Sequence, residues 1–240
     1  MPSHAEIYKT HPLKYEALVS REDYKQNIPR ALRKIADWRG KNIAELGAGT
    51  GRLTLILATE SKSITAFDNS TQMLAVARKK LEKADIRNWR LKPADNRKIP
   101  LPNNCADITI SAWSISYLAQ GAMADWQPHV DAALDEMRRL LIAGGTAVII
   151  ESLGTGSRKP APPNRRLAVY YNYLERQGFA RSSIRTDYKF KTKAEAAELA
   201  EFFFGEEMGE KIKKSGSRIL PECTGIWHWR KTGLSRAPSR

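Results

Sequence analysis

Short apolar runs alternate with helical periods along this chain, and the alternation defines the elements that we expect. Apolar runs bounded by glycine or polar residues predict buried strands. The strand-like runs are residues 42–46, 63–67, 89–92, 107–111, 146–151, 184–190 and 224–230. Segments with one apolar helical face lie at residues 12–38, 53–59, 72–82, 128–141, 166–177, 194–204 and 206–214. Strands that alternate with helices predict a parallel α/β sheet.

The segment Gln72–Glu82 illustrates the helical pattern. Its apolar residues share one face at helical spacing, so we interpret them as core packing and not as a cofactor site. These residues are Met73, Leu74, Val76, Ala77 and Leu81. Asn69 or Ser70, just upstream, can cap this helix.

The most informative local motif follows the first predicted strand. Glu45 precedes three alternating glycines, Gly47, Gly49 and Gly51, and a helix-like segment comes next. A strand, a glycine turn and a helix N-terminus together make a cradle for a nucleotide cofactor. The dinucleotide fingerprint G-x-G-x-x-G has a third glycine where this chain has Arg52. An acid two residues before the first glycine suits a positively charged cofactor better than a pyrophosphate.

This segment resembles the first motif of the class I S-adenosylmethionine-dependent methyltransferases. The resemblance covers residues 40–151 strongly and the remainder loosely. It is closest to the small methyltransferases of the ubiquinone/menaquinone-biosynthesis type, a group with many unrelated substrates. It implies S-adenosylmethionine as cofactor and a Rossmann-like, doubly wound α/β sheet of seven strands, mostly parallel with an antiparallel last strand. Periodicity alone does not fix the strand order.

The resemblance implies cofactor contacts at the carboxyl ends of the strands, where ligands lie in open α/β sheets. Asp68 ends the second strand, and its family counterpart accepts hydrogen bonds from both ribose hydroxyls; Asn69 follows it. The alternative for Asp68 is an Asx turn that opens the next helix. The counterpart of Asp95 accepts the adenine amino hydrogen, and the backbone N–H of Asn96 donates to a ring nitrogen. A polar loop residue is the alternative for Asp95.

The same resemblance implies roles for three further residues beside the glycine turn. Glu45 either orders the turn or binds the ammonium of the methionyl moiety. Ser111 and Trp113 end the fourth strand, where the family places the methionyl moiety and the mouth for methyl transfer. Trp113 offers a π face to the sulfonium or shields the acceptor, and core packing is an equal alternative for a tryptophan.

The acceptor site is less well defined by the sequence. We expect it among the N-terminal segment around Tyr8, His11 and Tyr15, the loop at residues 152–163 and the loop before the seventh strand. The candidate substrate contacts are Tyr15, Trp113 and Tyr117.

Methyl transfer from a sulfonium is an in-line displacement that needs alignment and a dry pocket. A base is needed only for a protonated acceptor. The candidate bases are Glu151, which ends the fifth strand and ranks first, and then His129 and Asp125.

Composition limits the class of protein. With 240 residues, the chain forms one large domain or a domain with a small lid. We expect an N-terminal helical lid at 1–39, a methyltransferase domain at 40–231 and a disordered tail at 232–240. No apolar run approaches the roughly 18 residues that span a bilayer, and the N-terminus lacks the layout of a secretory signal. Cys105 and Cys223 form no metal-type spacing, so we expect no metal and a cytoplasmic location.

A net charge of +14 leaves the partner open. Such a charge can indicate a nucleic-acid partner, but the basic residues are scattered over predicted helix faces, without interleaved aromatic residues. We therefore predict methyl transfer to a small-molecule acceptor. The first alternative is a methyltransferase acting on rRNA or tRNA through the basic surface. The others are a nicotinamide-dependent oxidoreductase, which needs the missing third glycine, and a non-catalytic RNA-binding module, which needs neither Asp68 nor Asp95. The oligomeric state stays open.

Overall fold

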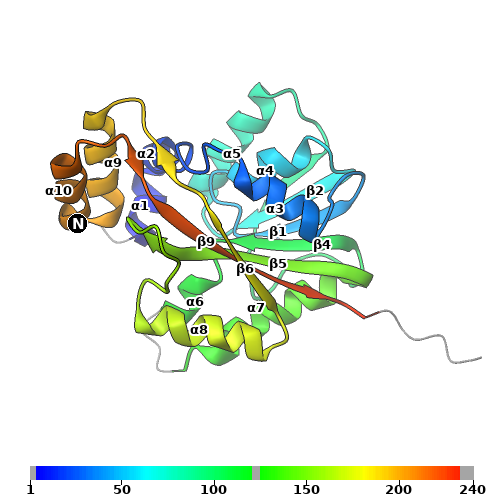
Figure 1. Cartoon of the computed structure of the whole chain (residues 1–240). Coiled ribbons are helices and arrows are strands. Elements are labelled where there is room, and N and C mark those ends of the chain that lie inside the picture. Colours follow the sequence, from blue (N-terminus) through cyan, green and yellow to red (C-terminus); the bar gives the residue numbers. More distant parts are fainter. Residues whose placement is uncertain (1–3, 121–124, 233–240) are drawn as a thin grey trace, which may run out of the picture.

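A twisted seven-stranded sheet with helices on both faces forms the body of the protein (Figure 1). The computed structural model describes residues 4–120 and 125–232. The strand order is β3-β2-β1-β4-β5-β9-β6, and β7 and β8 form a separate two-stranded sheet. The strands are β1 (Asn42–Leu46), β2 (Ser63–Asp68), β3 (Trp89–Pro93), β4 (Ala106–Ala112), β5 (Leu141–Thr155), β6 (Ala180–Arg185), β7 (Tyr188–Lys189), β8 (Ile219–Leu220) and β9 (Glu222–Arg230).

The helices form three groups around this sheet (Figure 1). Helices α3, α4 and α5 cover one face, and α6, α7 and α8 cover the other. Helices α1 and α2 lie at one end beside α9 and α10. The helices are α1 (His4–Thr10), α2 (Pro12–Val19), α3 (Asn27–Ile35), α4 (Arg52–Ala58), α5 (Thr71–Lys83), α6 (Ser116–Gln120), α7 (Gln127–Leu140), α8 (Arg165–Arg176), α9 (Lys193–Phe204) and α10 (Glu206–Ser215).

The predicted fold class is confirmed. Strands β1 to β5 are parallel to one another, and the last strand, β9, is antiparallel to both β5 and β6. The last strand does not lie at the sheet edge, because it is inserted between β5 and β6. The resemblance implied the directions of the strands, and only the structure gives this order.

Three predicted boundaries are wrong. The run at 184–190 divides into the end of β6 and the short β7, which pairs with β8 in the second sheet. The predicted glycine stop after the helix at 128–141 lies inside β5, because α7 ends at Leu140 and Leu141 already pairs with Ala106 of β4. Residues 152–155, predicted as loop, also belong to β5, where β9 continues to pair with them. The predicted tail at 232–240 lies outside the described residues except for its first one.

The register of the central strands places the chain's polar motifs at one end of the sheet. Leu46, the last residue of β1, pairs with Phe67 of β2 and with Ser111 of β4. The residues that follow these strands therefore emerge side by side. They are the glycine turn after β1, Asp68 at the end of β2 and Trp113 after β4.

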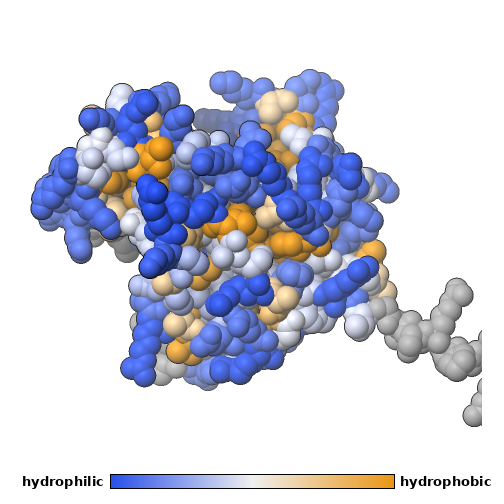
Figure 2. Space-filling model, viewed as in Figure 1, coloured by the Kyte–Doolittle hydropathy of each residue, from blue (hydrophilic) through white to orange (hydrophobic). Residues whose placement is uncertain are grey.

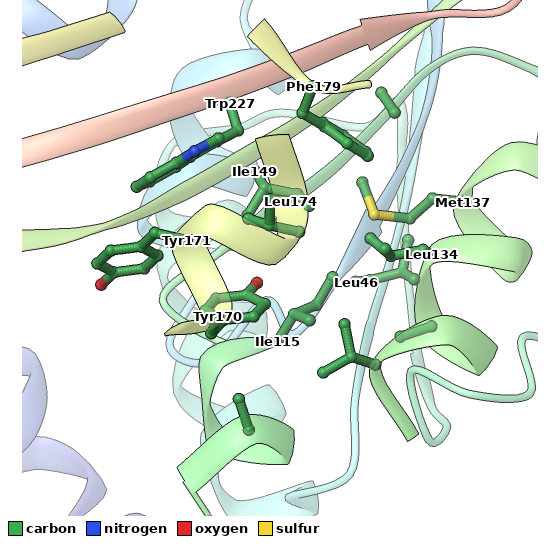
Figure 3. Packing of buried hydrophobic residues seen from close by; sticks show 14 of the residues in the cluster. Leu46, Ile115, Leu134, Met137, Ile149, Tyr170, Tyr171, Leu174, Phe179 and Trp227 are labelled. Atoms are coloured by element: carbon green, nitrogen blue, oxygen red, sulfur yellow. The ribbon is translucent and has the colours of Figure 1, made fainter. Parts of the chain in front are cut away.

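The larger core lies between the sheet and the layer formed by α6, α7 and α8 (Figure 3). Tyr171 of α8 packs on Trp227 of β9, with ring centroids 4.6 Å apart. Leu46 of β1, Ile149 of β5 and neighbouring helix residues complete this fully buried cluster. Truncation of a buried aromatic side chain typically costs about 3–5 kcal/mol. This packing holds β9 in the middle of the sheet.

A smaller core joins the N-terminal helices to α9 and α10. It is built from Leu18 of α2, aromatic residues of the β7 region and apolar residues of α9 and α10. Ion pairs surround it: Lys80–Glu16 connects α5 to α2 (2.7 Å), and Arg21–Glu195 connects the segment after α2 to α9 (2.8 Å). Helices α1 and α2 thus pack against both the sheet layer and the α9–α10 pair.

The edge strand β6 has a polar surface. Residues 180–183 of this strand are exposed, and Figure 2 shows mostly hydrophilic side chains on the face that carries β6 and α8. Charged and polar residues on an edge strand disfavour pairing with another sheet. Within residues 4–120 and 125–232, no helix is long and apolar enough to cross a bilayer.

Candidate active site

A cavity of about 520 Å³ opens at the carboxyl ends of β1, β2 and β4. It receives side chains from the glycine turn, from the residues after β2, β3 and β4, and from helices α1, α2 and α6. Among its lining residues are Tyr8, Lys9, Tyr15, Glu45, Gly47, Gly49, Arg52, Asp68, Asn69, Asp95, Asn96, Arg97, Trp113 and Tyr117. Residues from seven separate segments of the sequence therefore meet at one site.

Two glycines of the turn are required for different reasons. Gly47 has φ +78°, and a Cβ there would lie 1.9 Å from Ser114 Oγ, across the floor of the cavity. Gly51 has φ +73°, and its Cβ would lie 2.8 Å from Ala77 Cβ of α5. Both positions lie in the left-handed region that favours glycine. Gly51, predicted as part of the cradle, instead allows α4 to pack closely on α5 and is not among the described lining residues.

Asp68 ties the glycine turn to the end of β2. Its Oδ2 accepts the backbone N–H of Gly49 at 2.8 Å, and its Oδ1 accepts that of Ser70 at 2.8 Å. Burial raises the pKa of this carboxyl, and the two hydrogen bonds oppose that shift. Ser70 Oγ in turn accepts the N–H of Met73 and caps α5. The Asx-type role is therefore present, and the same carboxylate also faces the cavity beside Asn69.

Glu45 lies beneath the turn, almost fully buried. Its Oε2 accepts a hydrogen bond from Thr54 Oγ1 of α4 at 2.6 Å. Burial raises the pKa of Glu45 to about 7. Of the two roles predicted for Glu45, ordering the turn is supported by this hydrogen bond, because it joins β1 to α4 across the glycine turn.

Asp95 and Asn96 line the opposite side of the cavity. Arg97 occupies the Asp95 carboxylate through a hydrogen bond of 2.6 Å to Oδ2 and further bonds to Oδ1, and its guanidinium lowers the pKa of Asp95. Asn96 Nδ2 donates to Ser114 Oγ at 2.9 Å. An adenine amino group at Asp95 therefore has to share the carboxylate with Arg97.

A family model described as a methyltransferase domain matches residues 44–149, the stretch that carries the glycine turn, Asp68 and Asp95. Residues 44–149 of this chain are therefore similar to a methyltransferase domain. The phosphatidylethanolamine N-methyltransferase of Cereibacter sphaeroides is 28% identical over 137 residues, which are 57% of this chain and 63% of that protein. The ubiquinone/menaquinone biosynthesis C-methyltransferase of Rubrivivax gelatinosus is 29% identical over 122 residues, 51% of this chain and 43% of that protein.

Solved structures share the fold of this chain at low sequence identity. The N-methyltransferase NodS from Bradyrhizobium japonicum, solved with S-adenosyl-L-homocysteine, has a TM-score of 0.52 and 14% identity, covering 86% of each chain. The matches to the two curated relatives above span 63% and 43% of their lengths. The similarity is thus centred on the segment that carries the glycine turn, Asp68 and Asp95, and the residues outside it have to be interpreted from their own contacts.

Trp113 stands at the mouth of the cavity in a strained conformation, with φ +50°. The Arg52 guanidinium lies 3.9 Å from the centroid of its ring and forms an ion pair with Glu22. Trp113 therefore lines the cavity with one face already occupied by a cation. Ser111, predicted beside it, is buried in β4 and does not occur among the described lining residues, because its side chain alternates away from the cavity side.

Three tyrosines form the wall opposite the glycine turn. Tyr15 and Tyr117 were predicted substrate contacts, and Tyr8 of α1 lies between them, with ring centroids 5.1 Å from Tyr15 and 5.9 Å from Tyr117. The Tyr8 and Tyr117 hydroxyls are hydrogen-bonded to each other. The structure brings Tyr15, Trp113 and Tyr117 to the same cavity; their role toward an acceptor stays a prediction.

The predicted bases are placed elsewhere. Glu151 has both carboxylate oxygens bonded to Ser116, at 3.0 Å to the N–H and 2.7 Å to Oγ, so it caps α6. Burial raises its pKa to about 7. His129 of α7 is bonded through Nδ1 to Arg97 Nη1 at 2.8 Å. Neither these two residues nor Asp125 occurs among the described residues that line the cavity, which corrects their assignment as bases that touch an acceptor.

Sequence reasoning missed Lys9 and Arg97 as lining residues, and treated Arg52 only as a departure from the dinucleotide fingerprint. Tyr8 was expected in the acceptor segment, and the structure places it on α1 and Tyr15 on α2, so two separate helices bring them to the cavity. Nothing in the local sequence of Arg97 distinguishes it from a surface arginine. Among the described residues, no group of three or more His, Cys, Asp or Glu side chains is arranged to hold a metal.

Proposed function

We propose that this protein transfers the methyl group of S-adenosylmethionine to a small-molecule acceptor. One observation carries the proposal: the glycine turn and the Asp68 carboxylate face one side of a cavity whose other side is formed by the tyrosines of α1, α2 and α6. Bound S-adenosylmethionine supplies a methyl group activated by a positively charged sulfur. The protein has to align the acceptor with that methyl group and exclude water.

The cofactor would lie against the β1–β2 side of the cavity. There the Asp68 carboxylate, already fixed by two backbone N–H groups, has lone pairs left for ribose hydroxyls. Gly47 leaves room for close approach, and the buried Glu45 holds the turn through Thr54. Asp95, whose carboxylate Arg97 also binds, and the backbone of Asn96 would contact the adenine. Glu45 and Asp68 add negative potential near a cofactor that carries a sulfonium and an ammonium.

The acceptor would lie between this side and the N-terminal lid, which we propose to comprise residues 1–39. Helices α1 and α2 supply Tyr8, Lys9 and Tyr15, so the cavity is roofed and of a size for a small molecule. The curated relatives are named for a phospholipid amine and for quinone precursors. We place the protein in the cytoplasm. RNA is the alternative acceptor, motivated by the net charge of +14.

Two measurements test this proposal. Calorimetric titration should give a micromolar or tighter dissociation constant for S-adenosylhomocysteine, and saturating ligand should raise the melting temperature by mass action. NAD serves as the control. Label from methyl-labelled S-adenosylmethionine should then enter the small-molecule fraction of a cell extract and not the RNA fraction. Binding of NAD alone would refute the cofactor assignment. Incorporation of label into RNA, with RNA binding that weakens steeply as the salt concentration rises, would favour the alternative acceptor.

A further inference from the structure

A chain of hydrogen-bonding groups leads from the cavity to the protein surface. Tyr8 Oη of α1 is bonded to Tyr117 Oη of α6, and Tyr117 Oη lies 3.3 Å from Nδ1 of His4 at the start of α1. Tyr8 and Tyr117 line the cavity; Tyr117 is also 37% exposed, and His4 is exposed. The first and last members are one helical turn apart on α1, and the middle member comes from α6.

Aromatic contacts fix the positions of these three side chains. The His4 ring stacks on Phe203 of α9, with centroids 4.6 Å apart and planes at 11°, and meets the Tyr117 ring nearly edge-on at 5.9 Å. Tyr8 is held almost perpendicular to both Tyr15 and Tyr117. The three polar groups are therefore held in sequence by packing and not only by their mutual bonds.

The chemistry of the groups suits proton passage. A phenolic hydroxyl donates one hydrogen bond and accepts others, and a neutral imidazole nitrogen accepts a proton. Burial raises the pKa of Tyr117 to about 12 and that of Tyr8 well above its usual value. Both hydroxyls therefore stay protonated near neutral pH, which suits groups that pass a proton on.

Resting on the proposed function, we propose that Tyr8, Tyr117 and His4 form a path that carries the acceptor's proton out of the cavity. It follows that the acceptor's nucleophilic atom carries a proton at neutral pH, as a phenol hydroxyl or a protonated amine does. An acceptor that is already anionic would not need the path. Tyr8 and Tyr117 touch the cavity, and His4 acts through Tyr117 as a positioning and proton-accepting residue.

The step balances without any further reactant. The acceptor's nucleophilic atom gives up its proton before or as its electron pair bonds the methyl carbon; a protonated amine has to lose the proton first, because its nitrogen has no free pair. The carbon–sulfur bond breaks onto sulfur, which loses its positive charge. The acceptor's proton passes to Tyr8 Oη, the Tyr8 proton to Tyr117 Oη and the Tyr117 proton to His4 Nδ1. His4, now an imidazolium, releases its proton to water. Both tyrosines end as they began, so the path is ready for another turnover.

Other acids and bases near the site are committed to other contacts. Glu45 is bonded to Thr54 on the cofactor side, and Asp68 holds two backbone N–H groups. Glu151 and His129 lie outside the described lining. In the part of the chain that the structure describes, the Tyr8 and Tyr117 hydroxyls form a continuous hydrogen-bonded route from this cavity to the exposed imidazole of His4.

The test uses the full-length protein and the labelled extract fraction as acceptor. The variants are Tyr117→Phe and His4→Gly, with Tyr173→Phe as the matched control for Tyr117→Phe, because the Tyr173 hydroxyl is also hydrogen-bonded, to Asp131, but lies on α8 outside the described lining of the cavity. We expect kcat to fall at least tenfold in both test variants, because general acid–base groups contribute about 10²–10⁴-fold. Affinity for S-adenosylhomocysteine, measured by calorimetry, should stay within about twofold of wild type. Imidazole added to the buffer should restore His4→Gly and not Tyr117→Phe.

Each outcome decides one point. Unchanged kcat in Tyr117→Phe, or a loss in His4→Gly that imidazole does not rescue while cofactor affinity is retained, would overturn the proton path and leave the proposed function standing. A wild-type protein that labels no small molecule would refute the proposed function and the path with it. Mass analysis of the labelled product separates an aryl methyl ether from a methylamine and so identifies which protic acceptor the path serves.

Discussion

The two walls of the cavity are held by different kinds of contact. The β1–β2 wall is formed mainly by backbone groups. There is no room for a side chain at Gly47, and the N–H of Gly49 bonds to Asp68, 19 residues away. On the lid wall, side chains from distant segments meet, as in the hydroxyl bond between Tyr8 and Tyr117, 109 residues apart. The first wall is built from one local stretch, and the second exists only after α1 has docked.

This difference explains why the walls suit different tasks. A wall made of backbone conformation accepts few substitutions and fits one cofactor. A wall made of side chains on separate helices can change its acceptor by single substitutions that leave the sheet intact. Loops and lids on a rigid scaffold commonly carry such variable function.

The largest effect on cofactor affinity should come from Gly47→Val. A Cβ at this position would lie 1.9 Å from Ser114 Oγ, and a β-branched residue at φ +78° is strained by about 1–3 kcal/mol before any clash. We expect no measurable binding of S-adenosylhomocysteine by calorimetry. Gly40→Val is the matched control, because Gly40 has φ +66° but no atom within 4 Å of its added Cβ. Equal affinity in both variants would show that the turn does not approach the cofactor.

A smaller loss is expected for Asp68→Ala. The variant removes the acceptor proposed for the ribose hydroxyls and frees the N–H groups of Gly49 and Ser70, at a cost of about 2–4 kcal/mol of binding. The dissociation constant for S-adenosylhomocysteine should therefore rise at least tenfold, with the melting curve still cooperative. Asp85→Ala removes a carboxylate from an exposed Asp–Arg pair and should leave the affinity unchanged. A variant that binds like wild type would reduce Asp68 to a helix-start residue.

The smallest effect on affinity is expected for Glu151→Gln, which alters the support of the lid wall, since Glu151 caps the helix that carries Tyr117. Binding of S-adenosylhomocysteine should change by less than about twofold, and the pH dependence of stability should change instead. Burial raises the pKa of Glu151 to about 7 in the folded protein, so the folded state favours the protonated carboxyl. The resulting contribution to the free energy of unfolding is complete below the unfolded pKa, about 4.3, and is lost as the pH rises toward 7.

Chemical denaturation at pH 5 and pH 8 measures this effect. The wild-type free energy of unfolding should decline more steeply between the two than that of Glu151→Gln, by roughly 3 kcal/mol for a shift of this size. Glu45 has a similar raised pKa and remains in the variant, so its share of the decline persists. An equal decline in the free energy of unfolding for wild type and Glu151→Gln would mean that Glu151 is ionised in the folded protein at both pH values.

The sequence was sufficient for the β1–β2 wall because its determinants are local. Glycine spacing, an acid before the turn and an acid at the next strand end all lie within residues 45–68, and the structure brings Glu45, Gly47, Gly49 and Asp68 to one cavity. The cofactor contacts themselves remain a prediction. Helix and strand types also followed from periodicity, because α5 and the central strands bury one face or both.

The rest depended on contacts that one sequence does not display. The position of β9 between β5 and β6 is set by packing of Trp227 against α8, not by any property of the strand alone. Glu151 was correctly placed at a strand end, yet its side chain turns to the start of α6, where Ser116 satisfies both oxygens. The pairing of Tyr8 with Tyr117, and of both with His4, arises only from the docking of α1.

The insertion of β9 between β5 and β6 has a consequence for synthesis on the ribosome. During translation β5 emerges long before residues 222–230, so its outer edge has no partner while α8, β6 and the α9–α10 pair are made. Strand β6 cannot join the sheet either, since its described sheet partner is β9 alone. An open strand edge in a nascent chain invites pairing with other chains. The sheet can close only in its final step, so a stalled or prematurely terminated chain would expose the edge that the finished protein keeps covered.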